Sequence, residues 1–152
     1  MFLYGKTSAN AIAIMSFLAA DPERRSGSAE IAAARGIPQP ITAKLLSRLA
    51  STGLVEGQPG PGGGYKLAVC PGEIRLLDIA SLFEPHSVPK PCPFGHERCG
   101  KSDPCPLHDR IAELQNEAQR FLEETHLSSF AKETLDCCRP ICRKEKAEVA
   151  LT

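Results

Sequence analysis

Three cysteines and one histidine in the second half of the chain have side chains that bind metal ions. They are Cys92, Cys99, Cys105 and His108. Six residues separate the first two cysteines, five separate the next two, and the histidine lies three positions beyond the last cysteine. Thiolates with one imidazole suit an iron-sulfur cluster or a zinc ion. Zinc sites typically begin with a Cys-x-x-Cys pair, which this sequence lacks, and the residues by themselves leave both kinds of centre open.

The segment that contains the three cysteines has a composition that forms no regular secondary structure without a bound group. Residues 84–106 contain six prolines, three cysteines and two histidines but almost no aliphatic side chains, so they cannot form a helix or a core strand. A loop of this length rarely has a fixed structure of its own. Metal coordination would supply that structure, with His96 as a competing fourth ligand to His108.

A helix that begins at Pro106 would bring two of the ligands together. With Cys105 as the cap, Cys105 and His108 lie one turn apart on one helix face. The N-terminal end of a helix also favours a thiolate and a nearby anionic cluster. We therefore expect these two residues to reach a common centre.

The other four cysteines have a different interpretation. None of the seven cysteines lies in the first 69 residues, and the sequence has no export signal, which argues for metal or redox chemistry over a disulfide framework. Cys70 is expected to be a small, partly buried residue at the end of a strand. Cys137, Cys138 and Cys142 are interpreted as structural or incidental.

The composition is that of a single globular domain. The 152 residues are 42% hydrophobic and 24% charged, with a formal net charge of zero. Residues 1–68 carry seven Lys and Arg against four Asp and Glu, whereas residues 69–152 carry eleven against fourteen. No stretch reaches the ~20 uninterrupted apolar residues of a membrane helix. These values exclude a large multidomain enzyme, a disordered chain and a membrane protein, and we expect a cytoplasmic protein.

Local patterns in residues 1–83 predict a winged helix-turn-helix domain. Apolar spacing and capping residues predict helices over residues 7–20, 28–35, 40–52 and 74–83. The apolar stripe of the third helix is Ile41, Leu45, Leu46 and Leu49. Short strands at residues 54–55 and 65–67 flank a glycine-rich tip. The expected fold class is mainly α with a small β-hairpin wing, followed by a long C-terminal dimerisation helix.

A winged helix-turn-helix places one helix in the major groove of DNA and its hairpin along the backbone or in the minor groove. Gln39 and Thr42 lie where the third helix would first meet base edges, and both can hydrogen-bond to bases. Phosphate contacts are expected from Lys44, Arg48 and Lys66, with Arg24, Arg25 and Arg35 further away. The predicted partner is double-stranded DNA.

Residues 107–126 are predicted to form a long helix with an apolar seam. The seam positions, separated alternately by four and three residues, are Leu107, Ile111, Leu114, Ala118, Phe121 and Thr125. Such a helix pairs with its copy across a two-fold axis, so we expect a homodimer. An intramolecular core helix is the alternative. The dimerisation unit, with one further short helix, spans residues 107–135, and residues 136–152 form a charged tail.

Several runs in the sequence are typical of one family. They are Ser28-Ala29-Glu30-Ile31-Ala32, Gly36-Ile37-Pro38, Leu45-Leu46-Ser47-Arg48-Leu49, Gly53-Leu54-Val55, Gly60-Pro61-Gly62-Gly63-Gly64-Tyr65 and Ile74-Arg75-Leu76-Leu77-Asp78-Ile79. On these runs the chain resembles the Rrf2 family of bacterial winged-helix transcription regulators. The resemblance implies a homodimer that reads DNA. Family members often have an arginine before the wing glycines, where this chain has Pro59 with Gln58 beside it, so Gln58 is the candidate wing contact.

The resemblance also bears on the metal ligands. IscR-like members of the family hold a 2Fe-2S cluster with three loop cysteines and a histidine, and the similar residues here are Cys92, Cys99, Cys105 and His108. This chain has one more residue between the first two cysteines. A 4Fe-4S cluster or zinc remains the alternative cofactor.

We therefore predict a dimeric DNA-binding transcription regulator whose operator affinity is controlled by an iron-sulfur cluster that senses iron, redox state or nitric oxide. The alternatives are a zinc-binding or thiol-sensing regulator of the same fold, and a cluster-carrying electron-transfer or assembly protein. An enzyme is not expected, because no nucleophile, base and orienting group occur together. The glycine triplet also lies in a hairpin and not in a strand-to-helix phosphate loop.

Overall fold

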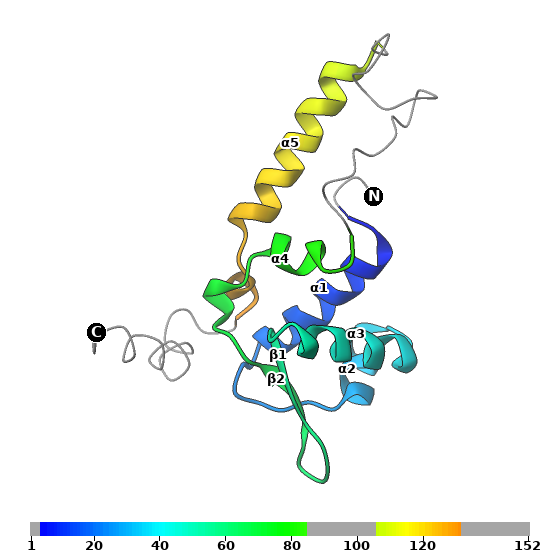
Figure 1. Ribbon diagram of the computed structural model, residues 1–152, viewed down its shortest axis with the longest axis vertical. Coiled ribbons are helices and arrows are strands. Elements are labelled where there is room, and N and C mark those ends of the chain that lie inside the picture. Colours follow the sequence, from blue (N-terminus) through cyan, green and yellow to red (C-terminus); the bar gives the residue numbers. More distant parts are fainter. Residues whose placement is uncertain (1–3, 85–105, 132–152) are drawn as a thin grey trace, which may run out of the picture.

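The computed structural model describes residues 4–84 and 106–131 of the chain. A helical body carries a β-hairpin that projects from one end and a helix, α5, that projects from the other (Figure 1). The described elements are α1 (Lys6–Ala19), α2 (Ser28–Arg35), α3 (Gln39–Ser51), β1 (Val55–Gln58), β2 (Gly64–Leu67), the 3-10 turn η1 (Pro71–Glu73), α4 (Leu76–Ser81), α5 (His108–Glu124) and the 3-10 turn η2 (Leu127–Phe130). The predicted class, mainly α with a small hairpin, is confirmed.

Helix α1 lies at the centre of the body and is buried on most of its surface. Ala11, Ile14 and Met15 have no exposed area, because α1 packs against α2, α3, α4, β2 and η2. A helix with neighbours on several sides needs apolar or small residues on all of them. Two serines of α1, Ser8 and Ser16, are accordingly buried as well. The other elements are positioned on this helix.

Helices α2 and α3 form the predicted helix-turn-helix. Gly36 ends α2 with φ of 64°, a left-handed conformation that glycine adopts without a Cβ clash. The buried Ile37 follows, and its N–H donates to the Ala32 carbonyl oxygen at 3.1 Å. Pro38 is the N-cap of α3, and its carbonyl oxygen accepts the N–H groups of Ile41 and Thr42, both at 3.0 Å.

The register of α3 differs from the prediction at two neighbouring positions. Ile41 was expected in the core but is 44% exposed, and Thr42 was expected at the DNA surface but is completely buried. The physical reason is helical spacing, since Thr42 lies three and four positions before the buried Leu45 and Leu46 and therefore shares their face. The Thr42 hydroxyl donates to the Pro38 carbonyl oxygen at 3.3 Å. The prediction that Thr42 contacts DNA is corrected on this ground.

The wing is an antiparallel pair of strands with a third segment beside it. Val55 pairs with Leu67 and Gln58 pairs with Gly64, so β1 is longer than predicted. Ser26 and Tyr65 exchange backbone hydrogen bonds of 3.0 and 2.9 Å, which adds the α1–α2 connection to the edge of β2. Gly64 has φ of 129°, and a Cβ there would lie 2.8 Å from the Ser26 carbonyl oxygen. Only glycine fits this crossing of two backbones.

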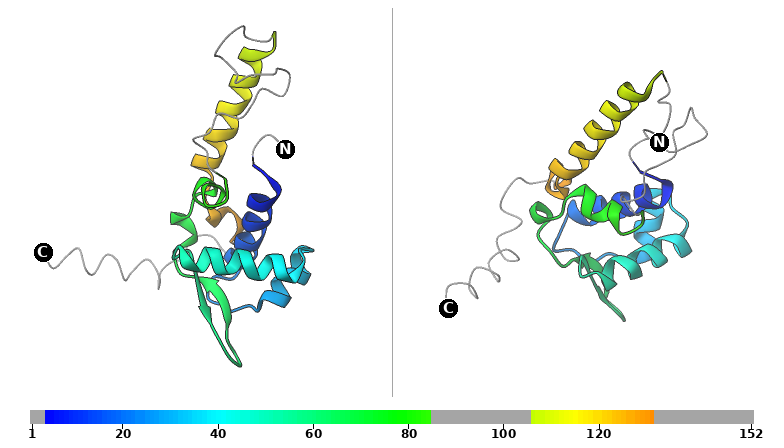
Figure 2. Two further views of the ribbon diagram at one scale, coloured as in Figure 1. Left: turned by 45° about the vertical axis from the view of Figure 1, so that its right-hand side comes forward. Right: turned by 45° about the horizontal axis from the view of Figure 1, so that its top comes forward.

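Helix α4 is shorter than the predicted helix over residues 74–83 because a backbone pairing stops it at its N-terminal end. The N–H of Leu127 donates to the Ile74 carbonyl oxygen at 2.8 Å, and the N–H of Leu76 donates to the Thr125 carbonyl oxygen at 2.9 Å. Ile74 and Leu127 are both buried. These two backbone hydrogen bonds hold the C-terminal end of α5 against the body. The rest of α5 extends away from the body in each view (Figures 1 and 2).

Two predicted helix boundaries also change. Helix α5 begins at His108 with Leu107 as its N-cap, not at Pro106. Cys105 lies outside the described residues. The short helix expected from residue 128 onward is the 3-10 turn η2, within the part of the chain that the structure describes.

Candidate nucleic-acid interface and metal ligands

The exposed face of α3 presents the polar and cationic side chains that the sequence assigned to DNA. Gln39, Lys44 and Arg48 are all exposed. Gln39 is the first residue of the helix, and Arg48 lies in its last turn. The opposite face carries the buried leucines, so the whole helix is anchored in the core along one side. The arrangement can present a hydrogen-bonding group and two cations to a groove and its phosphates.

The wing adds two further predicted contacts. Gln58 is exposed at the end of β1, next to the glycine-rich tip. Lys66 is half-buried on β2, directly opposite Glu56 in the strand register. Cross-strand neighbours of opposite charge attract. The Lys66 ammonium is therefore attracted to the Glu56 carboxylate as well as to a DNA phosphate. The hairpin projects beyond the helical body (Figure 1).

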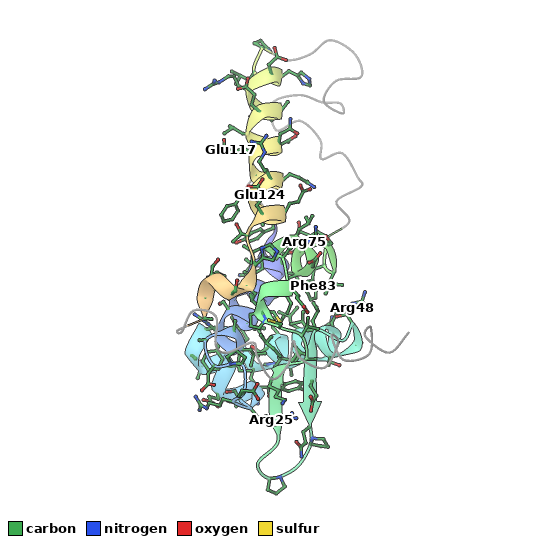
Figure 3. The ribbon with its side chains drawn as sticks, turned by 90° about the vertical axis from the view of Figure 1, so that its left-hand side faces the viewer. Arg25, Arg48, Arg75, Phe83, Glu117 and Glu124 are labelled. Carbon is green, nitrogen blue, oxygen red and sulfur yellow. The ribbon has the colours of Figure 1, made fainter. Side chains whose placement is uncertain are left out.

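Arg25 has a role that the sequence did not reveal. It was grouped with distant phosphate contacts, but its guanidinium forms an ion pair with Glu56 on β1. It also donates to the carbonyl oxygen of Gly64 on β2 at 3.4 Å. Only 20% of the Arg25 side chain is exposed. Arg25 therefore holds both strands of the wing against the α1–α2 connection, beside the base of the hairpin (Figure 3).

The other two arginines of this region also have protein partners. Arg24 pairs with Glu30 at 2.5 Å. Arg35 donates to the Ser16 hydroxyl at 3.1 Å, and its guanidinium carbon lies 5.6 Å from the centre of the Phe17 ring. A cation at that distance from an aromatic face is attracted to it. Both side chains bind within the body and are a weaker choice for phosphate contacts than Lys44 and Arg48.

Of the four predicted metal ligands, the structure describes one. His108 is the first residue of α5 and is half-buried. Cys92, Cys99 and Cys105 lie outside the described residues, as do the alternative ligand His96 and the C-terminal cysteines. Within residues 4–84 and 106–131, no three His, Cys, Asp or Glu side chains come together in a way that could hold a metal ion. Cys70 is buried, with 3% of its surface exposed, as expected of a structural residue.

A carboxylate at the edge of the cysteine-containing segment contacts the start of α1. Glu84 Oε1 accepts hydrogen bonds from the Gly5 N–H at 2.5 Å and from the Ser8 hydroxyl at 2.7 Å. An anionic group at a helix N-terminus is stabilised by the unpaired N–H groups there. No local sequence pattern indicates this contact, because Ser8 and Glu84 are 76 positions apart.

A second ionic contact lies where α4 meets the end of α5. Two nitrogens of Arg75 donate to the Asp78 carboxylate, at 2.8 and 3.1 Å, and the Arg75 backbone N–H donates to it at 3.0 Å. These hydrogen bonds from Arg75 hold the pKa of Asp78 below its usual value. Arg75 itself forms a backbone bridge with His126. The Arg75–Asp78 ion pair therefore lies where the C-terminal end of α5 joins the body (Figure 3).

Helix α5 exposes large apolar side chains at regular intervals. Leu107 is 47% exposed, Leu114 is 54% exposed and Phe121 is 50% exposed. These residues are seven positions apart, and Phe130 is also exposed beyond the helix. Ile111 and Leu122 are buried, so the helix is covered only in part.

Comparison with known proteins identifies the family. A family profile described as "Rrf2: Iron-dependent Transcriptional regulator" matches residues 4–133. The chain belongs to the Rrf2 family. An Aquifex aeolicus protein that carries the name of an HTH-type transcriptional regulator is 30% identical over 130 residues, which is 84% of this chain and 90% of that protein. The transcriptional regulator IscR of Xenorhabdus nematophila is 34% identical over 110 residues, 71% of this chain and 66% of that one.

Solved structures of Rrf2-type regulators have the same fold. CymR, the global cysteine regulator of B. subtilis, superposes with a TM-score of 0.66 at 24% identity over 83% of this chain and 95% of that chain. T. potens IscR superposes with a TM-score of 0.61 at 21% identity over 97% of this chain and 90% of that chain. This Rrf2 protein is therefore a DNA-binding winged-helix transcription regulator. Its relatives are named as regulators, which confirms the prediction that it is not an enzyme.

The lengths and compositions of the described helices bear on whether one of them could cross a membrane. Among the described parts of the chain, none of the helices has the length and apolar character that crossing a bilayer requires.

Proposed function

We propose that this Rrf2 regulator acts as a homodimer whose affinity for its operator is set by an iron-sulfur cluster, most simply 2Fe-2S, held by Cys92, Cys99, Cys105 and His108. Such a protein works in the cytoplasm, where the chromosome is. The donor set fits the group, because three thiolates and an imidazole satisfy the ligand preference of iron-sulfur clusters. When bound, the cluster supplies a centre that is sensitive to iron supply, oxidants or nitric oxide.

The observation that carries the proposal is the position of His108. This residue begins α5, and the chain at the opposite end of α5 is hydrogen-bonded to the DNA-binding body, through Thr125 with Leu76 and Leu127 with Ile74. A helix transmits a displacement at one end to the other because its backbone hydrogen bonds make it stiff. A change in how His108 is held therefore alters the position of α5 relative to the winged helix.

The change in DNA affinity follows from linkage between two conformations. If the ligated protein favours the dimer geometry that fits the operator, loss of ligation shifts the population away from it. The size of the effect is limited by the difference in affinity between the two states. In the DNA-competent state, we assign Gln39 to base edges, Lys44, Arg48 and Lys66 to phosphates, and Gln58 to the wing contact.

The dimer itself is proposed to form through α5. Leu107, Leu114 and Phe121 supply apolar contacts at the seven-residue spacing that two paired helices require. Each dimer then presents two α3 helices to the two half-sites of an operator.

The test is purification under oxygen-free conditions followed by iron and sulfide analysis, visible absorption and fluorescence anisotropy with operator DNA selected from a random pool. We expect brown protein with equal iron and sulfide and specific binding that weakens as salt rises. His108→Ala should lose the cluster and change operator affinity at least tenfold, whereas the matched loop variant His96→Ala should retain both.

Other outcomes would contradict specific parts of the proposal. Colourless protein that contains zinc, or no metal, and still binds its operator would establish the zinc or thiol alternative. If the protein retains no DNA sequence more strongly than competitor DNA, it does not bind an operator specifically and the proposed function is wrong. If His96→Ala loses the cluster and His108→Ala keeps it, the fourth ligand is His96 and not His108.

A further inference from the structure

One large apolar side chain is exposed on the winged-helix body. Within residues 4–84, Ile41 is the only large hydrophobic residue with substantial exposure, at 44%. The other exposed large apolar residues of the described chain, Leu107, Leu114, Phe121 and Phe130, lie on α5 or next to its ends. An isolated exposed isoleucine needs no explanation on most surfaces, but this one lies on the helix assigned to DNA.

Ile41 occupies the part of α3 that meets the groove first. It is the third residue of the helix, and Lys44 and Arg48 follow three and seven positions later. Residues at those spacings lie on neighbouring turns of one helix side. In helix-turn-helix proteins, the N-terminal residues of the recognition helix contact base edges. Cations at Lys44 and Arg48 that bind phosphates would therefore hold Ile41 against the bases.

The backbone around Ile41 is fixed from inside the protein. The Pro38 carbonyl oxygen accepts hydrogen bonds from the Ile41 N–H and the Thr42 N–H, both at 3.0 Å, and from the Thr42 hydroxyl at 3.3 Å. Thr42 is completely buried beneath this turn. A β-branched side chain in a helix has one strongly preferred χ1 rotamer. The χ1 angle of Ile41 is thus largely set before binding, and little conformational entropy is lost there when the side chain contacts a partner.

We propose that Ile41 reads the 5-methyl group of thymine in the major groove. This inference rests on the proposed function in one respect, namely that α3 binds operator DNA. Isoleucine cannot hydrogen-bond to a base, and the thymine methyl is the apolar group that the major-groove edges of the base pairs offer. Burying one methyl contributes about 0.8 kcal/mol, which is about a fourfold change in affinity.

The experiment removes that methyl group from the DNA. An operator is first selected from a random duplex pool with the wild-type protein, and each thymine is then replaced singly by deoxyuridine, which lacks only the methyl. Dissociation constants come from fluorescence anisotropy. For the wild type, we expect one thymine in each half-site at which the replacement weakens binding about fourfold. Ile41→Ala should bind the thymine and uracil operators equally at that position.

A second variant and a control separate this effect from a general loss of structure. Ile41→Gln replaces the apolar branched side chain by a polar one that suits a helix, and it should also lose the preference for thymine. Ser47→Ala changes another exposed residue of α3 and should keep the full preference. Circular dichroism and melting should be unchanged in all three, because the altered side chains are exposed.

The outcomes distinguish this inference from the proposed function. If no specific sequence is selected, the proposed function fails and the inference fails with it. If an operator is selected but the wild type is indifferent to every deoxyuridine replacement, only the thymine contact is overturned. Retention of the same thymine preference by Ile41→Ala would also overturn it.

Discussion

At the scale of single residues, the Thr42 hydroxyl helps to hold the first turn of α3. It donates to the Pro38 carbonyl oxygen at 3.3 Å from a fully buried position. The same carbonyl oxygen accepts two backbone N–H groups, so removal of the hydroxyl leaves no buried acceptor without a donor. Thr42 therefore contributes to packing and not to recognition.

This role makes Thr42→Val a direct test. Valine has a similar shape and replaces the buried hydroxyl by a methyl, so the free energy of unfolding should change by less than about 1 kcal/mol. Operator affinity, measured by anisotropy, should stay within about twofold of the wild type. Arg48→Ala is the contrasting variant. It should weaken binding to all sequences and reduce the slope of log affinity against log salt concentration by about one. A selective loss of affinity in Thr42→Val would restore it as a base contact.

At the scale of elements, the short helix α4 and the end of α5 depend on each other. The bridge between Arg75 and His126 joins them through the backbone, and Asp78 binds both the side chain and the N–H of Arg75. The Asp78 side chain is 34% exposed, so water screens the pair and its contribution to stability is small.

The lowered pKa of Asp78 gives this contact a defined pH dependence. Because the Arg75 hydrogen bonds hold the folded-state pKa below the unfolded value of 3.8, the stabilisation is present above that value and is lost as pH falls through the folded-state pKa. Asp78→Asn should therefore be less stable than the wild type at pH 7, and the difference should disappear once the pH is low enough to protonate Asp78 in the folded state. Urea unfolding at several pH values measures it. A constant difference across that range would rule out the titration of Asp78 as the cause.

At the scale of the whole molecule, the exposed seam of α5 determines what the proposed dimer can do. Leu114 lies in the middle of the seam and is more than half exposed. A charge at this position should prevent two apolar seams from packing but should leave the core of each subunit intact. The two half-sites of an operator would then be bound by separate subunits.

Leu114→Glu should accordingly convert the dimer to a folded monomer in sedimentation experiments. Its affinity for a two-half-site operator should fall by a factor of at least about 100, since the second binding event is no longer intramolecular. Gln115→Glu introduces the same charge at the neighbouring exposed position and should remain dimeric. A Leu114→Glu protein that stays dimeric would show that α5 is not the dimer interface.

The sequence by itself determined the features that depend on neighbours along the chain. Helix positions followed from apolar spacing, and α2 covers the predicted residues 28–35 because the next residue, Gly36, readily adopts the left-handed conformation that ends a helix. The wing glycines and the motif runs were sufficient to identify the fold and the family. Gln39, Lys44 and Arg48 were correctly placed on an exposed face, since polar residues opposite an apolar stripe face outward.

Only the tertiary structure decided which side of α3 the borderline residues occupy and which distant groups meet. The exposure of Ile41 and the burial of Thr42 depend on how α3 is rotated against the core, and side-chain polarity alone suggested the reverse. The pair of Arg25 with Glu56 joins residues 31 positions apart, and the bridge that shortens α4 joins Arg75 to His126. Such contacts form because folding brings separate segments together, and no local spacing records them.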